Sequence, residues 1–158
     1  MVQNQFDHLD LEILGALTAN ARMAFSQLAE QLKVSNSLVH QRVNKMREAG
    51  VLKSPIFPVR PGEMGFETCA FTQIMVTNAR FVDSVVSVLE QIPEIVECNN
   101  IAGRYAIMVK VYARNNSHLR DVLYEKIQPI EGVEETHTII SFETVFSRPV
   151  PMALPQPQ

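Results

Sequence analysis

The fold is decided by residues 33–50, which read KVSNSLVHQRVNKMREAG. Ser35 is a favourable N-terminal capping residue, and Gly50 is the residue type that most often follows a helix in the left-handed conformation. Between them, Val39, Val43 and Met46 recur at helical spacing and fall on one side of a helix. The stretch therefore predicts a helix over about 36–49, with one side packed against other helices.

The opposite side of this predicted helix carries side chains that suit DNA recognition. They are short or amide-bearing polar residues with cations and a histidine beside them: Ser37, Gln41, Asn44 and Glu48, flanked by His40, Lys45 and Arg47. Asn and Gln pair with adenine edges in the major groove, and Lys and Arg neutralise phosphates. The alternative is an ordinary solvated face, but such faces commonly favour Glu–Lys pairs at i,i+4 spacing. We therefore favour a DNA-binding face. For His40, a solvent-exposed side chain without a role in DNA binding stays an open alternative.

Two shorter helices are predicted before this one. The first has an apolar side at helical spacing, formed by Leu9, Ile13, Leu14 and Leu17. Asp7 is its expected N-cap, and Asp10 in its first turn complements the helix dipole. The second spans about 24–32, with an inward side formed by Phe25, Leu28, Ala29 and Leu32. Because only a short turn separates it from the helix after Ser35, the pair predicts a helix-turn-helix.

The segment after Gly50 is expected to be extended. Residues 51–61 contain Pro55, Pro58 and Pro61, which exclude a helix or a central strand. We interpret this segment as a stiff connector in the position of a wing and linker.

The remaining sequence predicts a strand–helix–strand–strand–helix–strand order. The expected ranges are 69–77, 79–91, 95–101, 105–112, 117–127 and 133–146. This order is that of the ferredoxin-like split motif. The predicted class is therefore α+β, with an N-terminal winged helix-turn-helix and a C-terminal ferredoxin-like βαββαβ effector and assembly domain. The expected divisions are 1–53 for the helix-turn-helix, 54–66 for the wing and linker, 67–147 for the second domain, and 148–158 for a disordered, proline-rich tail.

One face of the predicted sheet is expected to need a partner. Ile107, Val109 and Val111 lie on one face of their strand, whereas Met108 and Tyr112 add apolar surface to the other. Helices cover only one face in this motif, so an apolar second face favours a dimer.

Charge is divided unevenly along the chain. Residues 1–60 contain seven basic and five acidic residues, whereas the remainder contains seven basic and twelve acidic ones. A polyanion is therefore an expected partner of the N-terminal half only. No apolar run is long enough for a membrane span and no signal peptide is recognised, so we expect a cytoplasmic protein without a membrane partner. Cys69 and Cys98 lack a pairing motif and are expected to be small buried side chains.

Together these residues resemble the leucine-responsive regulator/AsnC family, the feast/famine regulators of prokaryotes. The resemblance runs from Leu9 to about Phe146 and rests on the order of many short matches: Leu9-Asp10-Leu11-Glu12-Ile13-Leu14, Ala21-Arg22, Leu28-Ala29, Val34-Ser35, Val39, Arg42-Val43, Gly50-Val51-Leu52, Pro61, Gly65-Phe66, Val96-Glu97-Cys98, Gly103, Gly132-Val133, Thr136 and Thr138. It implies a DNA-binding regulator that forms dimers, often joined as tetramers or octamers, and that responds to a small effector such as an amino acid.

The resemblance also implies site residues. DNA contacts fall on Asn36, Ser37, His40, Gln41, Asn44 and Lys45, to which we add Ser35 at the start of the helix and Arg47. Effector contacts fall on Asn99, Ile101, Gly103, Arg104, Tyr105, Ala106, Thr136 and Thr138.

Two positions depart from the family pattern. An acidic residue usually follows the glycine of the β-hairpin by three positions, whereas this chain has Ala106 there and a cation at Arg104. The Gly-Tyr that usually follows the third helix is replaced by Ser54-Pro55. An effector ammonium group therefore lacks its usual carboxylate in this sequence.

Catalysis and architectural DNA binding are the two alternatives to a regulator. The sequence shows no nucleophile–base arrangement, no phosphate-binding glycine loop and no metal-spaced cluster, so we expect neither catalysis nor a cofactor. An architectural DNA-binding protein stays as an alternative, because binding by cations alone would be salt-sensitive and largely independent of sequence.

Overall fold

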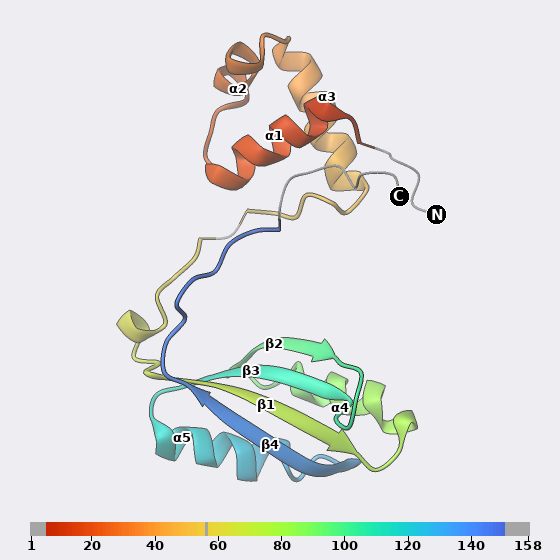
Figure 1. Cartoon of the computed structure of the whole chain (residues 1–158), viewed down its shortest axis with the longest axis vertical. Helices are drawn as coiled ribbons and strands as arrows, with labels where there is room; N and C mark the ends of the chain where they lie inside the picture. The colour runs from red at the N-terminus through yellow and green to blue at the C-terminus, as the bar shows by residue number, and fades with distance from the viewer. Residues whose placement is uncertain (1–5, 56, 151–158) are drawn as a thin grey trace. The chain divides into compact units, whose positions relative to one another are not determined.

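The computed structural model describes residues 6–55 and 57–150. The chain divides into two compact units (Figure 1). The first contains residues up to Pro58 together with residues from Ser147 onward, and the second spans Val59–Phe146.

The first unit contains three helices around a small apolar core. Helix α1 spans His8–Ala19, α2 spans Phe25–Leu32 and α3 spans Asn36–Glu48. Fully buried side chains come from all three helices: Ile13, Leu28, Val39, Val43 and Met46. The predicted inward side of the third helix is therefore confirmed.

Local signals in the sequence set the ends of these helices. Asp7 caps α1 and forms a reciprocal capping box with Asp10. Ser35 caps α3 by accepting a hydrogen bond from the Leu38 backbone N–H at 3.2 Å. Gly50 has a φ of 70°, which ends the helix where the sequence predicts it. By contrast, the N-cap position of α2 is Ala24, which provides no side-chain cap, so tertiary packing must stabilise this helix.

The connector is irregular in the residues that the structure describes. In its described residues, 51–55 and 57–61, no helix or strand forms, in agreement with its prolines. A short 3₁₀ turn at Gly62–Met64, which the sequence reading did not predict, follows within the second unit.

The second unit is a four-stranded antiparallel sheet with its helices on one face (Figure 1). The strands are β1 (Thr68–Val76), β2 (Ile95–Asn100), β3 (Ile107–Ala113) and β4 (Val133–Ser141), in the spatial order β2-β3-β1-β4. A 3₁₀ turn at Ala79–Phe81 leads into α4 (Val82–Leu89), and α5 (Asn116–Asp121) continues as a π-helical segment over Val122–Ile127. The order of elements confirms the ferredoxin-like prediction.

The last strand is shorter than predicted. It ends at Ser141 instead of Phe146, where its pairing with β1 stops at the Cys69–Ser141 pair. Phe142, the next residue, is fully exposed. The prediction that both cysteines are buried is also wrong, since Cys69 is half-buried and Cys98, on the edge strand β2, is exposed.

Burial alternates strictly along β3, where Ile107, Val109 and Val111 face the helices. The other face of the sheet includes Phe71, Met108, Tyr112 and Ile139, none of which is buried within this unit. The sheet thus has an open apolar face, as the sequence predicts. No helix in the described residues is long and apolar enough to cross a membrane.

Candidate DNA-binding face and effector site

Helix α3 presents the predicted DNA-binding residues to solvent. All of them are exposed: Ser35, Asn36, Ser37, His40, Gln41, Asn44, Lys45 and Arg47. Gln41, Asn44 and Lys45 line a shallow polar hollow along the helix. The helix therefore places amide groups and cations together on one accessible surface.

At least four of these residues also have contacts within the unit, and the Lys45 ammonium lies 5.7 Å from the centroid of the Phe6 ring. Ser35 caps the helix and lies 3.0 Å, oxygen to oxygen, from the Ser37 hydroxyl. The His40 ring packs edge-on against Phe25 of α2, with ring centroids 4.8 Å apart. Ser35 thus positions the helix, and His40 contacts the preceding helix while its ring stays exposed.

Arg42 links α3 to the start of α1. Its Nη1 lies 2.6 Å from Asp7 Oδ2 and 3.2 Å from both Asp10 carboxylate oxygens. The Asp10 side chain is fully buried, whereas Asp7 is about half exposed. The hydrogen bond from Arg42 lowers the pKa of Asp7, and the Asp10 backbone N–H acts in the same direction. The Arg42 cation is therefore held against α1, a role that the sequence reading did not assign.

Five of the predicted effector residues lie on the turn between β2 and β3. Ile101, Gly103, Arg104, Tyr105 and Ala106 occupy this turn. The Ala106 N–H donates to the Ile74 carbonyl at 3.1 Å, which ties the turn to β1. Because β1 neighbours β4, Arg104 and Tyr105 come within reach of the strand at the opposite edge of the sheet.

Glu135 on β4 is the centre of the contacts made by this turn. Its Oε2 lies 2.8 Å from Arg104 Nη2, and its Oε1 accepts a hydrogen bond from the Tyr105 hydroxyl at 3.0 Å. This hydrogen bond, together with burial and the nearby carboxylate charge, raises the pKa of Tyr105. The Tyr105 ring also stacks on His137, with centroids 6.2 Å apart. Sequence reasoning missed Glu135, although it directly precedes the predicted Thr136.

Other predicted effector residues lie apart from this cluster. Thr136 and Thr138 pair with Ile74 and Thr72, so their side chains lie on the helix-covered face. Their hydroxyls contact Gln128 and Thr72, each at 3.0 Å. Asn99, on the edge strand β2, donates to Glu97 at 2.9 Å. Within one unit, the predicted effector residues therefore do not line a single cavity.

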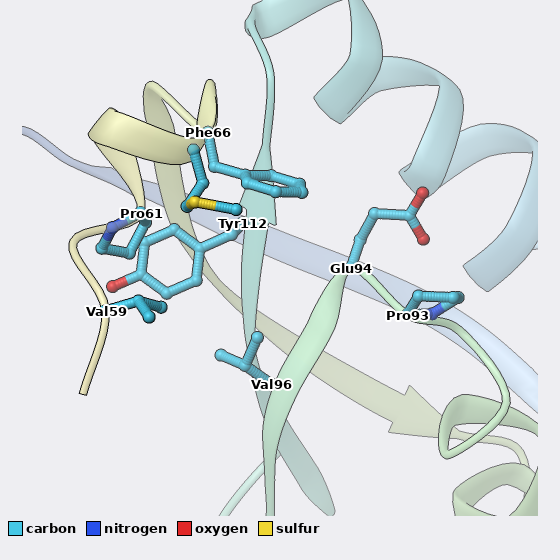
Figure 2. Close-up of a pocket in the computed structure, with 8 residues that line it drawn as sticks. Val59, Pro61, Phe66, Pro93, Glu94, Val96 and Tyr112 are labelled. Carbon is cyan, nitrogen blue, oxygen red and sulfur yellow. The ribbon is translucent and has the colours of Figure 1, made fainter. Parts of the chain in front are cut away.

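A separate apolar groove of about 460 Å³ lies beside the first turn of the second unit (Figure 2). Its walls include Pro61, Phe66, Val96 and Tyr112, and Glu94 lies at one end. Burial opposes ionisation of Glu94, but hydrogen bonds, chiefly from Lys126 at 2.7 Å, lower its pKa on balance. The groove is thus predominantly apolar, and its carboxylate already has a cationic partner.

The described residues offer no grouping for metal chemistry. Within residues 6–55 and 57–150, no three His, Cys, Asp or Glu side chains are grouped closely enough to hold a metal ion.

A helix-turn-helix with an exposed polar recognition helix, joined to a separate α+β unit, defines a two-domain DNA-binding regulator. Two family matches agree with this class. Residues 6–53 match the winged helix-turn-helix DNA-binding family, and residues 69–151 match the Lrp/AsnC ligand binding domain family. The chain belongs to the Lrp/AsnC family of transcription regulators.

Relatives along nearly the whole chain support this assignment. The regulatory protein AsnC of Escherichia coli K12 is 35% identical over 144 residues, which cover 91% of this chain and 95% of that protein. The HTH-type transcriptional regulator FL11 of Pyrococcus furiosus is 32% identical, with 85% and 87% covered. These relatives are named as regulators, so the function is regulatory and not enzymatic.

Solved structures show the same fold. The structure of E. coli AsnC matches with a TM-score of 0.86 at 35% identity, covering 92% of this chain and 97% of that one. A transcriptional regulator from Neisseria meningitidis, solved as a complex with L-methionine, matches with a TM-score of 0.83 at 16% identity and covers 90% and 94%.

Proposed function

We propose that this regulator binds double-stranded DNA sequence-specifically as a dimer and that an amino acid modulates this binding. The observation that carries the DNA-binding part is the exposed face of α3. Gln41 and Asn44 lie exposed on it, whereas Val39, Val43 and Met46 fill the core beneath. Amide side chains in this arrangement suit direct readout of adenine in the major groove.

The open face of the sheet supports the self-association part of the proposal. Phe71 and Met108 lie there beside Ile139, whose side chain is 51% exposed. Apolar surface of this kind is usually covered in a stable assembly. A two-fold dimer would place two α3 helices in successive major grooves about 34 Å apart, on a pseudo-palindromic site. Tetramers and octamers would form by further association of such dimers.

The effector part of the proposal rests on the family's ligand-binding domain and on the polar cluster at the β2–β3 turn. A protein of the same fold holds L-methionine. We assign the effector to Arg104, Tyr105 and the neighbouring backbone at Gly103 and Ala106. The effector alters DNA affinity only if it binds two assembly states with different affinity.

The DNA-binding part is tested with the double substitution Gln41→Ala and Asn44→Ala. Fluorescence anisotropy on the upstream DNA and on a scrambled fragment, at two salt concentrations, measures affinity and preference. Each bidentate amide–adenine contact contributes roughly 1–3 kcal/mol of discrimination, so the variant is expected to lose preference while keeping salt-dependent affinity. Gln91→Ala, an exposed amide after α4, is the matched control.

The same assay distinguishes sequence-specific binding from binding by an architectural protein. Equal, salt-sensitive binding of the wild-type chain to both fragments would favour architectural binding and contradict base readout. Adding each common amino acid in turn tests the effector: a shift in affinity with one of them supports the proposal. The effector part would be refuted if no amino acid changed the DNA affinity or the assembly state.

A further inference from the structure

A second hollow, of about 290 Å³, lies at the end of the sheet opposite the turn between β2 and β3. Its walls are Phe66, Pro93, Glu94, Arg114 and His118. Glu94 directly precedes β2 and Arg114 directly follows β3, so the two residues meet where one strand begins and the other ends. Phe66, Pro93 and Glu94 also line the apolar groove of Figure 2, so the two spaces adjoin. The hollow is therefore separate from the turn to which we assign the effector.

A chain of hydrogen bonds forms the polar side of this hollow. Glu94 Oε1 lies 2.7 Å from Lys126 Nζ and 3.2 Å from His118 Nε2. His118 Nδ1 accepts hydrogen bonds from the Arg114 backbone N–H at 3.2 Å and from its Nε–H at 3.4 Å. Because Nδ1 is an acceptor, the ring proton lies on Nε2, which donates to Glu94. The carboxylate thus orients the imidazole, and the imidazole orients the Arg114 guanidinium.

The network is buried at a cost to the fold. The Glu94 and His118 side chains are only 12% and 17% exposed. The second oxygen of Glu94, Oε2, is buried without a hydrogen-bond partner among the residues that the structure describes. Buried polar groups are nearly always hydrogen-bonded, and proteins break such rules mainly at functional sites. The network is therefore explained by what it orients and not by the stability that it contributes.

Arg114 is the member of the network that is available to a ligand. It is exposed, it lines the hollow, and neither of its Nη atoms has a hydrogen-bond partner among the described residues. A guanidinium held in one orientation binds a carboxylate through two parallel hydrogen bonds. The network contains two cations, Arg114 and Lys126, and one carboxylate, Glu94. A ligand with a single negative charge therefore balances it.

The apolar walls select the rest of the ligand. Phe66 and Pro93 border the hollow, and the adjoining groove continues along Val96 and Tyr112. Such walls favour a ligand with an aromatic or alkyl body, held in place by a few polar groups. A free amino acid is a poorer match because its ammonium group would lie beside the Arg114 cation. A phosphate ion has no apolar body to cover these walls.

We propose that Arg114 and the hollow beside it form a second ligand site, which binds a small organic monocarboxylate with an aromatic or alkyl body. The guanidinium donates two hydrogen bonds to the carboxylate of the ligand, whose apolar body lies against Phe66 and Pro93. Glu94 and His118 are positioning residues, because they act on the ligand only through Arg114. The site is independent of the amino-acid effector proposed above.

The experiment is a saturation-transfer-difference NMR titration of the full chain with two probes. Benzoate carries the carboxylate, whereas benzyl alcohol has the same ring without a charge. The test variant is Arg114→Gln. Arg120→Gln is the matched control, because Arg120 is an exposed arginine that pairs with Asp121 and does not line the hollow. Arg104→Gln is a second control at the effector turn, and circular dichroism checks that each variant is folded.

Arg114→Gln is expected to weaken benzoate by about 10- to 100-fold, the loss of a charge-assisted contact, and to leave benzyl alcohol unchanged. Arg120→Gln and Arg104→Gln should change neither probe. His118→Ala should weaken benzoate by a smaller factor, because the guanidinium loses its orientation. His118→Gln should restore the affinity, because its amide can both donate to Glu94 and accept from Arg114.

Three results would overturn the proposal. The first is an absence of benzoate binding to the wild-type chain. The second is equal weakening of benzoate and benzyl alcohol by Arg114→Gln, which would show a structural role for this residue only. The third is a loss of benzoate binding in Arg104→Gln but not in Arg114→Gln, which would place the carboxylate at the turn between β2 and β3.

Discussion

Gly132 immediately precedes β4, the strand that carries Glu135, and any side chain there would be strained. Its φ is +95°, a conformation that L-residues rarely adopt. A Cβ built there would lie 2.6 Å from both Cβ and Cγ of Phe81. Its carbonyl also accepts a hydrogen bond from the Thr77 N–H at 2.9 Å, so the backbone is not free to move away.

The expected cost of Gly132→Ala has two parts. A positive φ costs an L-residue roughly 1–2 kcal/mol. Forcing extra volume against a packed neighbour costs a further amount of about 1–3 kcal/mol. The free energy of unfolding of the second unit should therefore fall by roughly 2–5 kcal/mol, a large share of the stability of a small domain.

Gly65→Ala separates the two contributions. Gly65 has a φ of +81°, but a Cβ there meets nothing within 4 Å. This control should lose only the backbone part, about 1–2 kcal/mol. The difference between the variants then measures the contact with Phe81.

Urea unfolding followed by tyrosine fluorescence is the assay. The chain has no tryptophan, and all three tyrosines, at positions 105, 112 and 124, belong to Val59–Phe146. The signal therefore reports on this unit alone. Equal losses of stability in Gly132→Ala and Gly65→Ala would refute the reasoning from the Phe81 contact.

Four other outcomes are expected. Ser35→Ala removes the cap of α3 and should lower the stability of the first unit by about 1 kcal/mol in urea unfolding followed by circular dichroism, without changing the tyrosine signal. Met46→Ala leaves a cavity in the same core and should cost about 2–5 kcal/mol in that assay. Arg42 lowers the pKa of Asp7 below its usual 3.8, so the stabilisation from Asp7 is complete above pH 3.8 and is lost as pH falls through the folded-state pKa. In Asp7→Asn, the free energy of unfolding measured against pH should lack this loss. Ile139→Glu places a charge on the open sheet face and should shift sedimentation toward smaller species. An unchanged sedimentation profile would count against an interface on this face.

The first unit was predictable because its signals are local. The caps at Asp7 and Ser35 and the apolar spacing of Val39, Val43 and Met46 each act within a few residues. The structure places these residues as the sequence predicts. The short α2 was predicted from the same spacing.

The second unit was predictable in its order of elements but not in its details. The end of β4 depends on where its pairing with β1 stops, and nothing in residues 133–146 themselves marks Ser141 as the last paired position. Likewise, Glu135 meets Arg104, and Arg42 meets Asp10, across more than thirty residues. Such contacts follow from strand register and helix packing, which a pattern of residue types does not specify.

The contact of Arg42 with two carboxylates affects how salt acts on DNA binding. Salt weakens binding in proportion to the number of phosphates that protein cations neutralise, because each of them releases counterions. Helix α3 carries three basic residues, Arg42, Lys45 and Arg47, but Arg42 is already compensated by Asp7 and Asp10. The slope of affinity against salt concentration should therefore be smaller than three phosphate contacts would give, so this helix relies less on ionic attraction than its formal charge suggests.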